Sequence, residues 1–203
     1  TFTLNKIISH FDEHGISFVV GAFTHQAVSN IEFGNADTLA SILGIGLQIN
    51  QGSKNKHTVE KFVQKKDARP ADVIIVDEFS MVDEFYVDII RKSYAHIIWV
   101  GDDKQLSPVQ GGMIDVSQLP KIELTQPMRQ GKESALYSAC SVLREEGRLR
   151  DIIPKIDKKT LFKYKTKEDA LATFRQGDVF MAYTNREVNA LASMIMDREA
   201  FEA

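Results

Sequence analysis

Hydrophobic positions along this chain follow two different spacings, and together they predict strands separated by helices. Short apolar runs rich in β-branched residues are typical of buried strands, and they occur at 16–22, 73–76, 97–100 and 179–183. Apolar residues three and four positions apart predict amphipathic helices at 1–14, 81–92, 134–147 and beyond 184. Strands that alternate with helices favour an α/β fold, in which a parallel sheet carries helices on both faces.

The helix expected at 134–147 opens a second domain. It begins after a serine cap and ends at a glycine. We expect its buried face to carry Leu136, Ala139, Val142 and Leu143. The boundary falls near 126–132, so that residues 1–126 form one domain and residues 127–203 form part of another.

Composition predicts a packed core and excludes several classes of protein. The 203 residues are 43% hydrophobic and 26% charged, and the formal net charge of -3 gives no bulk attraction to nucleic acid. The single cysteine, Cys140, excludes an intrachain disulfide and a cysteine-cluster metal site. No apolar run approaches the roughly 18–20 residues of a membrane span. These features favour a soluble protein of a reducing compartment.

The near-neutral net charge of the chain is the sum of two segments of opposite charge and the rest of the sequence. Residues 50–69 carry six basic side chains against two acidic ones. Residues 72–103 carry eight acidic side chains against two basic ones. A basic insert therefore lies beside an acidic cluster in the sequence.

Two adjacent carboxylates, Asp77 and Glu78, follow the predicted strand at 73–76. Open α/β sheets bind ligands at the carboxyl ends of their strands, and Mg²⁺ prefers one or two carboxylates together with water and phosphate oxygens. Asp77 would hold a nucleotide-bound Mg²⁺, and Glu78 would orient or deprotonate the attacking water. The alternative is a solvated acidic loop after a core strand, and these residues alone do not separate the two.

A second polar segment follows the predicted strand at 97–100. Gln105 is neutral, with an amide that both donates and accepts hydrogen bonds, and it suits a sensor of a γ-phosphate or its water. Gly101 permits a close or left-handed backbone. The alternative is a surface turn, because Gly-Asp-Asp is ordinary turn chemistry.

Together these segments resemble motifs II and III of superfamily 1 helicases. The matching stretches are Asp-Glu-Phe-Ser-Met-Val-Asp at 77–83 and Gly-Asp-Asp-Lys-Gln-Leu-Ser-Pro-Val at 101–109. The RecD-like and Dda-like branch, which tracks 5′ to 3′ on single-stranded DNA, is the most similar. Further matches follow in the family's order at 21–27 (motif Ia), 38–44 (the next threonine block), 124–130 (motif IV) and 182–186 (the Thr-Asn-Arg block).

The resemblance implies a RecA-like fold of the P-loop NTPase class, with ATP and Mg²⁺ as cofactors. Residues 1–126 would be the first motor domain and 127–203 the start of the second. The resemblance gives Asp77 and Glu78 the Mg²⁺ and hydrolysis roles and has Gln105 couple nucleotide state to domain closure. Arg129 would reach the γ-phosphate like an arginine finger, its alternative being an ordinary surface salt bridge.

Contacts to single-stranded DNA are implied for four residues of these motifs: Thr24, His25, Thr38 and Asn185. Local capping or packing is the alternative for Thr24 and His25. The basic insert, residues 45–70, would form a β-hairpin whose tip can act as a wedge at a duplex junction. Within it Phe62 would stack on a base, and Lys61, Lys65 and Lys66 would meet phosphates. The alternative for Phe62 is a residue of a small core.

The sequence departs from the family in one important respect, because no Gly-x-x-x-x-Gly-Lys-Ser/Thr phosphate loop occurs in it. The segment from Thr1 reads like the helix that follows such a loop, which would make Thr1 its Mg²⁺-binding threonine and the chain an internal fragment. Motifs V and VI are also missing. Phe23 and Ala40 replace residues common in relatives, which affects the details of DNA contact.

The sequence thus predicts part of an ATP-dependent DNA helicase that translocates on single-stranded DNA and couples Mg-ATP hydrolysis to unwinding, while the isolated chain is inactive. The expected partners are single-stranded DNA, a duplex junction and replication or recombination proteins. A monomer in the cytoplasm of a bacterial or phage-infected cell is expected. The alternatives are a degenerate, non-hydrolysing module that binds single-stranded DNA, and a different nucleotide hydrolase.

Overall fold

The computed structural model describes residues 2–50, 59–109, 111–126, 128, 134–146, 169, 172–173, 175 and 184–202. The chain divides into two compact units, Thr1–Glu123 and Leu124–Ala203. Each unit is described by itself.

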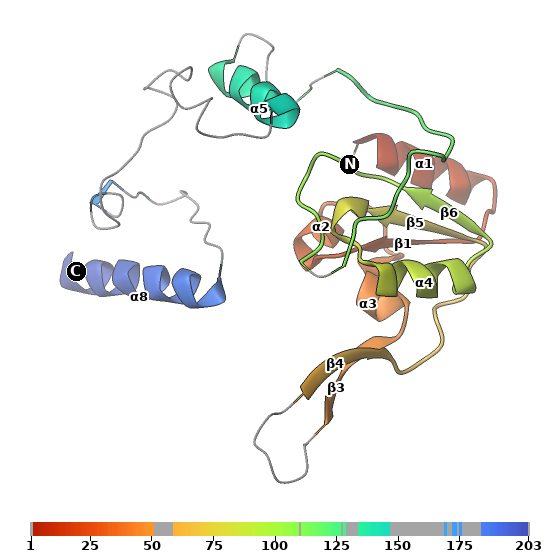
Figure 1. Cartoon of the computed structure of the whole chain (residues 1–203), viewed down its shortest axis with the longest axis horizontal. Helices are drawn as coiled ribbons and strands as arrows, with labels where there is room; N and C mark the ends of the chain where they lie inside the picture. Colours follow the sequence, from red (N-terminus) through yellow and green to blue (C-terminus); the bar gives the residue numbers. More distant parts are fainter. Residues whose placement is uncertain are drawn as a thin grey trace. The chain divides into compact units, whose positions relative to one another are not determined.

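The first unit is built on a parallel sheet with the strand order β2-β1-β5-β6 (Figure 1). Its strands are β1 (Phe18–Ala22), β2 (Ala36–Thr38), β5 (Val73–Asp77) and β6 (His96–Trp99). Its helices are α1 (Phe2–Glu13), α2 (His25–Ser29), α3 (Leu39–Ile42), the 3-10 turn η1 (Phe79–Met81) and α4 (Glu84–Ser93).

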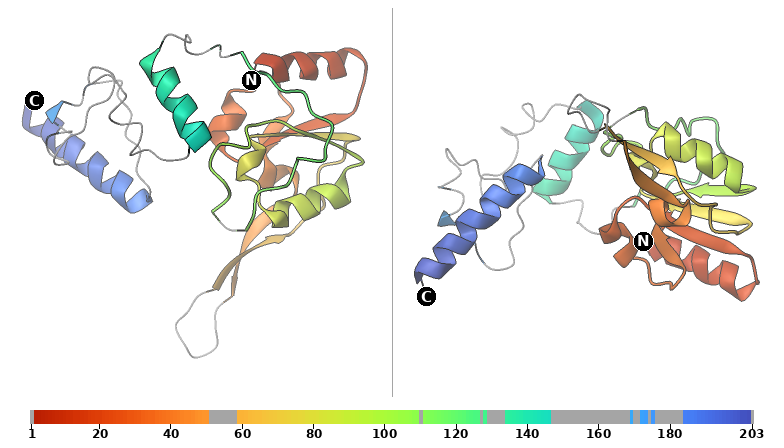
Figure 2. Two further views of the ribbon diagram at one scale, coloured as in Figure 1. Left: turned by 45° about the horizontal axis from the view of Figure 1, so that its top comes forward. Right: turned by 90° about the horizontal axis from the view of Figure 1, so that it is seen from below.

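Alternating strand residues divide the core between the two faces of this sheet. Val19, Ile74 and Val76 pack on the side of α3 and α4. Val20 and Ile75 pack with the buried residues of α1 on the other side. Figures 1 and 2 show α1 and α4 on opposite faces. The predicted α/β fold, a parallel sheet with helices on both faces, is confirmed.

Several expected boundaries need correction. The helix predicted at 81–92 begins later, at Glu84, because the Asp83 carboxylate caps it by accepting a hydrogen bond from the Tyr86 amide at 3.1 Å. Strand β2 and helices α2 and α3 were not predicted. Each is only three to five residues long, too short to display an apolar period.

The parallel register brings the carboxyl ends of the strands into line. Ala22 at the end of β1 pairs with Thr38 on β2 and with Asp77 on β5. On the other side, the Val100 amide that follows β6 donates to the Val76 carbonyl at 2.8 Å. We call this line of strand ends the carboxyl edge.

Residues 45–70, the segment expected to hold an inserted hairpin, contain the antiparallel pair β3 (Ile45–Asn50) and β4 (Val59–Gln64). The pair projects away from the sheet (Figure 2). At its base the Gly44 carbonyl accepts hydrogen bonds from the amides of Lys65 (2.8 Å) and Lys66 (3.2 Å). Gly44 has φ +66°, and a Cβ there would meet the Lys66 carbonyl, so glycine suits this close crossing.

The second unit contains α5 (Ala135–Glu146) and α8 (Asn185–Glu202) among its described residues. Thr184 and Glu187 form a capping box ahead of α8, in which each side chain bonds the other's backbone amide at 3.2–3.3 Å. The strand predicted at 179–183 lies outside the described residues.

The predicted burial of Leu143 on α5 is wrong, because its side chain is 40% exposed. Val142 is half-buried, and the side chains of Leu136 and Ala139 lie outside the described set. Among the described residues of this unit there is no strand layer to cover that face of α5. An apolar helical face is buried only where another element packs on it, which the spacing of residues does not reveal.

Candidate functional site

Asp77 ends β5 at the carboxyl edge, and its side chain is only 9% exposed. Burial raises the pKa of its carboxyl group, and the Glu78 amide, which donates to Oδ1 at 3.1 Å, offsets part of that rise. A buried carboxylate of this kind is stabilised by a nearby cation.

Glu78 follows in a left-handed conformation, with φ 54° and ψ 47°. Among the described residues, Glu78 is the one non-glycine residue with a positive φ. Such backbone costs on the order of 1–3 kcal/mol and persists where the surroundings hold it, often at functional sites. Glu78 directly follows β5 and directly precedes η1.

The loops after β5 and β6 are tied together beside these carboxylates. The Phe79 amide donates to the Val100 carbonyl at 3.1 Å. Gly101 has φ +154°, and a Cβ there would lie 2.8 Å from Phe79 Cδ1 and 3.0 Å from the Phe79 amide nitrogen. The prediction that Gly101 permits a close backbone approach is confirmed.

Gln105 lies in the turn that follows Gly101. Its amide donates to the Asp102 carbonyl at 3.1 Å, and the Asp102 carboxylate accepts from the Lys104 amide at 2.9 Å. The side chain of Gln105 is exposed. These hydrogen bonds show that the Gly-Asp-Asp segment forms a turn. The role of Gln105 as a sensor of the γ-phosphate stays a prediction.

Thr24 and Thr38 both serve as helix caps at the carboxyl edge. Thr24 Oγ1 accepts from the Ala27 amide at 3.1 Å, and Thr38 Oγ1 accepts from the Ser41 amide at 3.3 Å. Thr38 is buried, whereas His25, the first residue of α2, is exposed. Capping of α2 is the local role that the sequence offered as the alternative for Thr24. Contacts of Thr24, His25 and Thr38 to DNA stay predictions.

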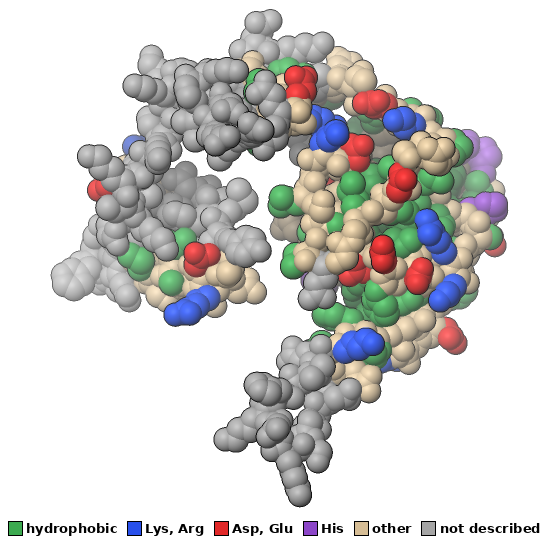
Figure 3. Space-filling view, in the orientation of Figure 1, with side chains coloured by type: hydrophobic (Ala, Val, Ile, Leu, Met, Phe, Trp, Pro, Cys, Tyr) green, Lys and Arg blue, Asp and Glu red, His purple; other side chains and the backbone are tan. Residues whose placement is uncertain are grey.

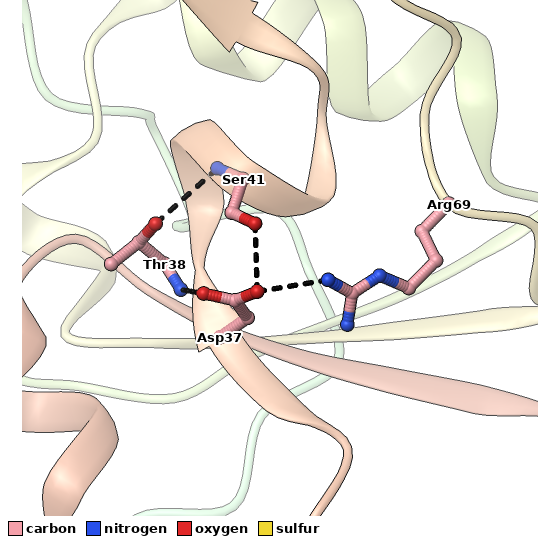
Figure 4. Close-up of polar contacts among 4 residues, drawn as sticks. All are labelled: Asp37, Thr38, Ser41 and Arg69. Carbon is pink, nitrogen blue, oxygen red and sulfur yellow. Dashed lines mark hydrogen bonds and ion pairs between the residues drawn. The ribbon is translucent and has the colours of Figure 1, made fainter.

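A polar network around Asp37, next to Thr38, was not predicted (Figure 4). The Asp37 carboxylate accepts hydrogen bonds from the Thr38 amide (2.7 Å), the Ser41 hydroxyl (2.7 Å) and Arg69 Nη2 (2.8 Å). Burial alone would raise the pKa of Asp37, but these hydrogen bonds and the charge of Arg69 lower it overall. Because Arg69 is 32 residues away, no local pattern pointed to the pair.

Arg69 also anchors the segment between the hairpin and β5. Its amide donates to the Ile42 carbonyl at 2.8 Å, and its carbonyl accepts the Tyr94 hydroxyl at 2.8 Å. The backbone and side chain of Arg69 therefore fix this segment to α3, to the residue that follows α4 and to Asp37 in β2.

We expect the Arg69–Asp37 ion pair to contribute modestly, because the two side chains are 39% and 35% exposed. A double-mutant cycle with Arg69→Met and Asp37→Asn should give a coupling energy of about 0.2–1 kcal/mol at pH 7. Unfolding is followed through Trp99, the single tryptophan, which lies in the first unit.

The pKa of Asp37 is lowered in the fold, so its stabilising contribution is present above the ordinary value of 3.8 and is lost as pH falls through the folded value. The coupling should therefore disappear in acid and weaken in high salt. A coupling energy that changes neither in acid nor in high salt would contradict an ion pair between Arg69 and Asp37.

A different pH dependence is expected for Asp77, whose raised pKa makes the folded state favour the protonated carboxyl group. Its unfavourable contribution is absent below the ordinary value of 3.8 and grows as pH rises through the folded value. Asp77→Asn should therefore leave the free energy of unfolding at pH 7 unchanged or higher.

Asp88→Asn, at an exposed position on α4, is the matched control for Asp77→Asn. The measurement is denaturant unfolding monitored by Trp99 fluorescence at pH 7. A clear loss of stability in Asp77→Asn alone would show that the charged carboxylate is a structural group.

The hairpin carries an exposed apolar pair. Phe62 on β4 lies opposite Leu47 on β3, and the two side chains are 55% and 38% exposed. That exposure does not fit the role of a core residue for Phe62. Lys61 is exposed, and Lys65 Nζ donates to the Leu47 carbonyl at 2.6 Å, which holds Lys65 along the hairpin. Basic side chains lie at the base of the hairpin in Figure 3.

The structure does not test the remaining predicted site residues. Thr1 and Arg129 lie outside the described residues. Asn185 is exposed at the first position of α8, in the second unit. Their roles stay predictions.

The structure is that of an α/β protein with two adjacent carboxylates, Asp77 and Glu78, at the carboxyl edge of its parallel sheet. A family model described as an AAA domain matches residues 1–163, so the chain belongs to the AAA domain family.

RecBCD enzyme subunit RecD from Buchnera aphidicola subsp. Acyrthosiphon pisum (strain APS) is 33% identical over 82 residues. That match covers 39% of this chain and 12% of RecD, so the chain spans a small part of the relative. The predicted resemblance to RecD-like superfamily 1 helicases is confirmed.

Among solved structures, the crystal structure of Bacteroides sp Pif1 in complex with ADP-AlF4 is similar over 52% of this chain and 27% of that chain, with 22% identity and a TM-score of 0.35. None of the described helices is long and apolar enough to cross a lipid bilayer.

Proposed function

We propose that this chain supplies the nucleotide-hydrolysing part of a RecD-like DNA helicase, which couples Mg-ATP hydrolysis to translocation on single-stranded DNA and to unwinding. The observation that carries the proposal is the carboxyl edge itself. There a buried carboxylate, a strained glutamate and the Gly101 loop come from adjacent strands.

Asp77 suits a hard cation such as Mg²⁺, because carboxylate oxygens are preferred Mg²⁺ ligands and a bound cation would offset the burial that raises the pKa of this group. Among the described residues its hydrogen-bond donor is the Glu78 amide on Oδ1. Bound Mg²⁺ supplies charge neutralisation on the phosphate oxygens. Asp77 would hold the ion together with Thr1.

Glu78 would orient the attacking water and accept its proton. Its left-handed backbone directly follows β5, and the hydrogen bond from the Phe79 amide to the Val100 carbonyl holds the next residue against the loop after β6. Gln105, on the loop that the same hydrogen bond secures, would sense the γ-phosphate. Arg129 would complete the site.

Single-stranded DNA would be held by the exposed His25 at the carboxyl edge and by Thr24, Thr38 and Asn185. The exposed Phe62 and Lys61 of the hairpin offer a stacking surface and a cationic partner for a phosphate. In this proposal residues 1–126 form the first motor domain and residues 127–203 belong to the second.

Strand displacement by the full-length protein that contains this chain tests the proposal. We expect Mg²⁺- and ATP-dependent unwinding of a duplex with a 5′ single-stranded tail, and little unwinding of the matched duplex with a 3′ tail. Binding of single-stranded DNA without hydrolysis or unwinding would instead identify a degenerate binding module.

The proposed role of the hairpin in binding single-stranded DNA is tested with Phe62→Ala. Loss of one base-stacking contact, worth about 1–3 kcal/mol, should weaken single-stranded DNA binding about 5- to 150-fold. The control is Phe85→Ala, which removes a 37% exposed aromatic side chain from α4. Fluorescence anisotropy with a labelled oligonucleotide measures both, and equal losses in the two variants would contradict the stacking role.

A further inference from the structure

Three potential metal ligands lie together at the end of α1, separate from the carboxyl edge. His10, Glu13 and His14 are exposed, and their nearest ligand atoms all lie within 4.8 Å of one another. Glu13 and His14 follow His10 by three and four residues, so each of them lies close to His10 at the end of the helix. Imidazole nitrogens with a carboxylate form a ligand set that suits Zn²⁺ and related transition metals.

The backbone at this end of α1 is held by a Schellman motif. Gly15 adopts φ +65°, its amide donates to the Asp12 carbonyl at 3.1 Å, and the Ile16 amide donates to the Phe11 carbonyl at 3.0 Å. Phe11 and Ile16 also pack against the same core cluster. The position of His14 in the helix cap is therefore fixed by its neighbours.

The His14 ring is oriented by a hydrogen bond from Nδ1 to the His10 carbonyl at 2.8 Å. A carbonyl oxygen only accepts, so Nδ1 carries the proton and Nε2 is the nitrogen with which neutral His14 can bind a metal. Metal-binding histidines commonly donate their other ring N–H to a carbonyl in this way. The His10 and His14 ring centroids are 4.1 Å apart, so both imidazoles are close enough to share one ion.

This cluster lies apart from the proposed nucleotide site. The end of α1 leads into the amino end of β1 at Phe18, whereas Asp77 lies at the carboxyl end of β5, roughly 13 Å away along a five-residue strand. A dication at the C-terminus of α1 would also interact favourably with the helix dipole.

We propose that His10, Glu13 and His14 form a site for a divalent transition-metal ion, with Zn²⁺ as the reference metal. Three protein ligands leave one tetrahedral position to water. Because the ligands span the last turn of α1 and its cap residue His14, the bound ion would hold that cap on the helix and stabilise the folded first unit.

The test is a Zn²⁺ titration of the purified, tag-free chain by isothermal titration calorimetry, with Co²⁺ absorption as a spectroscopic readout of the ligand geometry. We expect saturable one-to-one binding, with His10→Ala and His14→Ala each weakening it at least about tenfold, since even second-shell changes cost that much. Glu13→Gln should weaken it as well. His96→Ala, at an exposed position that starts β6, is the control and should bind as tightly as the unaltered chain.

A thermal melt supplies an independent readout. Zn²⁺ should raise the midpoint monitored by Trp99 fluorescence in the unaltered chain and in His96→Ala, but not in His10→Ala or His14→Ala. The proposal is overturned by absence of saturable Zn²⁺ binding, by binding that survives in His10→Ala and His14→Ala, or by an equal loss in His96→Ala.

Discussion

Glu78→Gln in the full-length protein is expected to lower ATP turnover about 10²- to 10⁴-fold while nucleotide binding is retained. Glutamine matches glutamate in size, so the left-handed turn at this position should persist. The amide can no longer accept a proton from the attacking water, and that step alone is lost. Steady-state hydrolysis and a fluorescent-nucleotide titration measure the two properties separately.

Glu84→Gln is the matched control, because Glu84 is an exposed acid in the first turn of α4. It should change neither turnover nor binding. Wild-type turnover in Glu78→Gln would remove Glu78 from the chemistry. Loss of nucleotide binding together with turnover would indicate that the side chain holds the fold or the nucleotide rather than the water.

Gly101→Ala is expected to destabilise the first unit by about 2–6 kcal/mol, the sum of a strained backbone and an overpacked contact. Gly101 has φ +154°, and the new Cβ would meet both the ring and the amide nitrogen of Phe79. The backbone contact cannot be relieved by a rotamer change. Denaturant unfolding followed through Trp99 measures the effect.

Gly34→Ala provides the comparison, because a Cβ at Gly34 meets nothing within 4 Å. It should leave the free energy of unfolding nearly unchanged. If Gly101→Ala is no more costly than Gly34→Ala, the two loops are not packed as described. Because Phe79 follows Glu78 directly, displacement of Phe79 should also lower turnover in any Gly101→Ala protein that folds.

The long apolar runs predicted the main strands because burial on both faces of a parallel sheet demands continuous hydrophobic sequence. Those runs also located Asp77, since a carboxylate directly after such a strand must lie at its end. Strand β2 escaped prediction because it has three residues and includes the charged Asp37.

Other features depend on tertiary contacts that no local pattern contains. Position 78 is a glutamate rather than a glycine, so its residue type did not indicate a left-handed backbone. The ion pair between Asp37 and Arg69 joins residues on either side of the hairpin. The exposure of Leu143 likewise depends on what packs against α5. Local spacing identified Asp77 and Glu78, whereas the strained backbone at Glu78 and the polar network around Asp37 required the structure.

Whether the carboxyl edge hydrolyses ATP in response to DNA is decided by the ATPase rate of the full-length protein with and without single-stranded DNA. We expect Mg²⁺-dependent hydrolysis that rises when single-stranded DNA is added and falls about 10²- to 10⁴-fold in Glu78→Gln. Hydrolysis that is indifferent to DNA, or that persists in Glu78→Gln, would contradict this expectation.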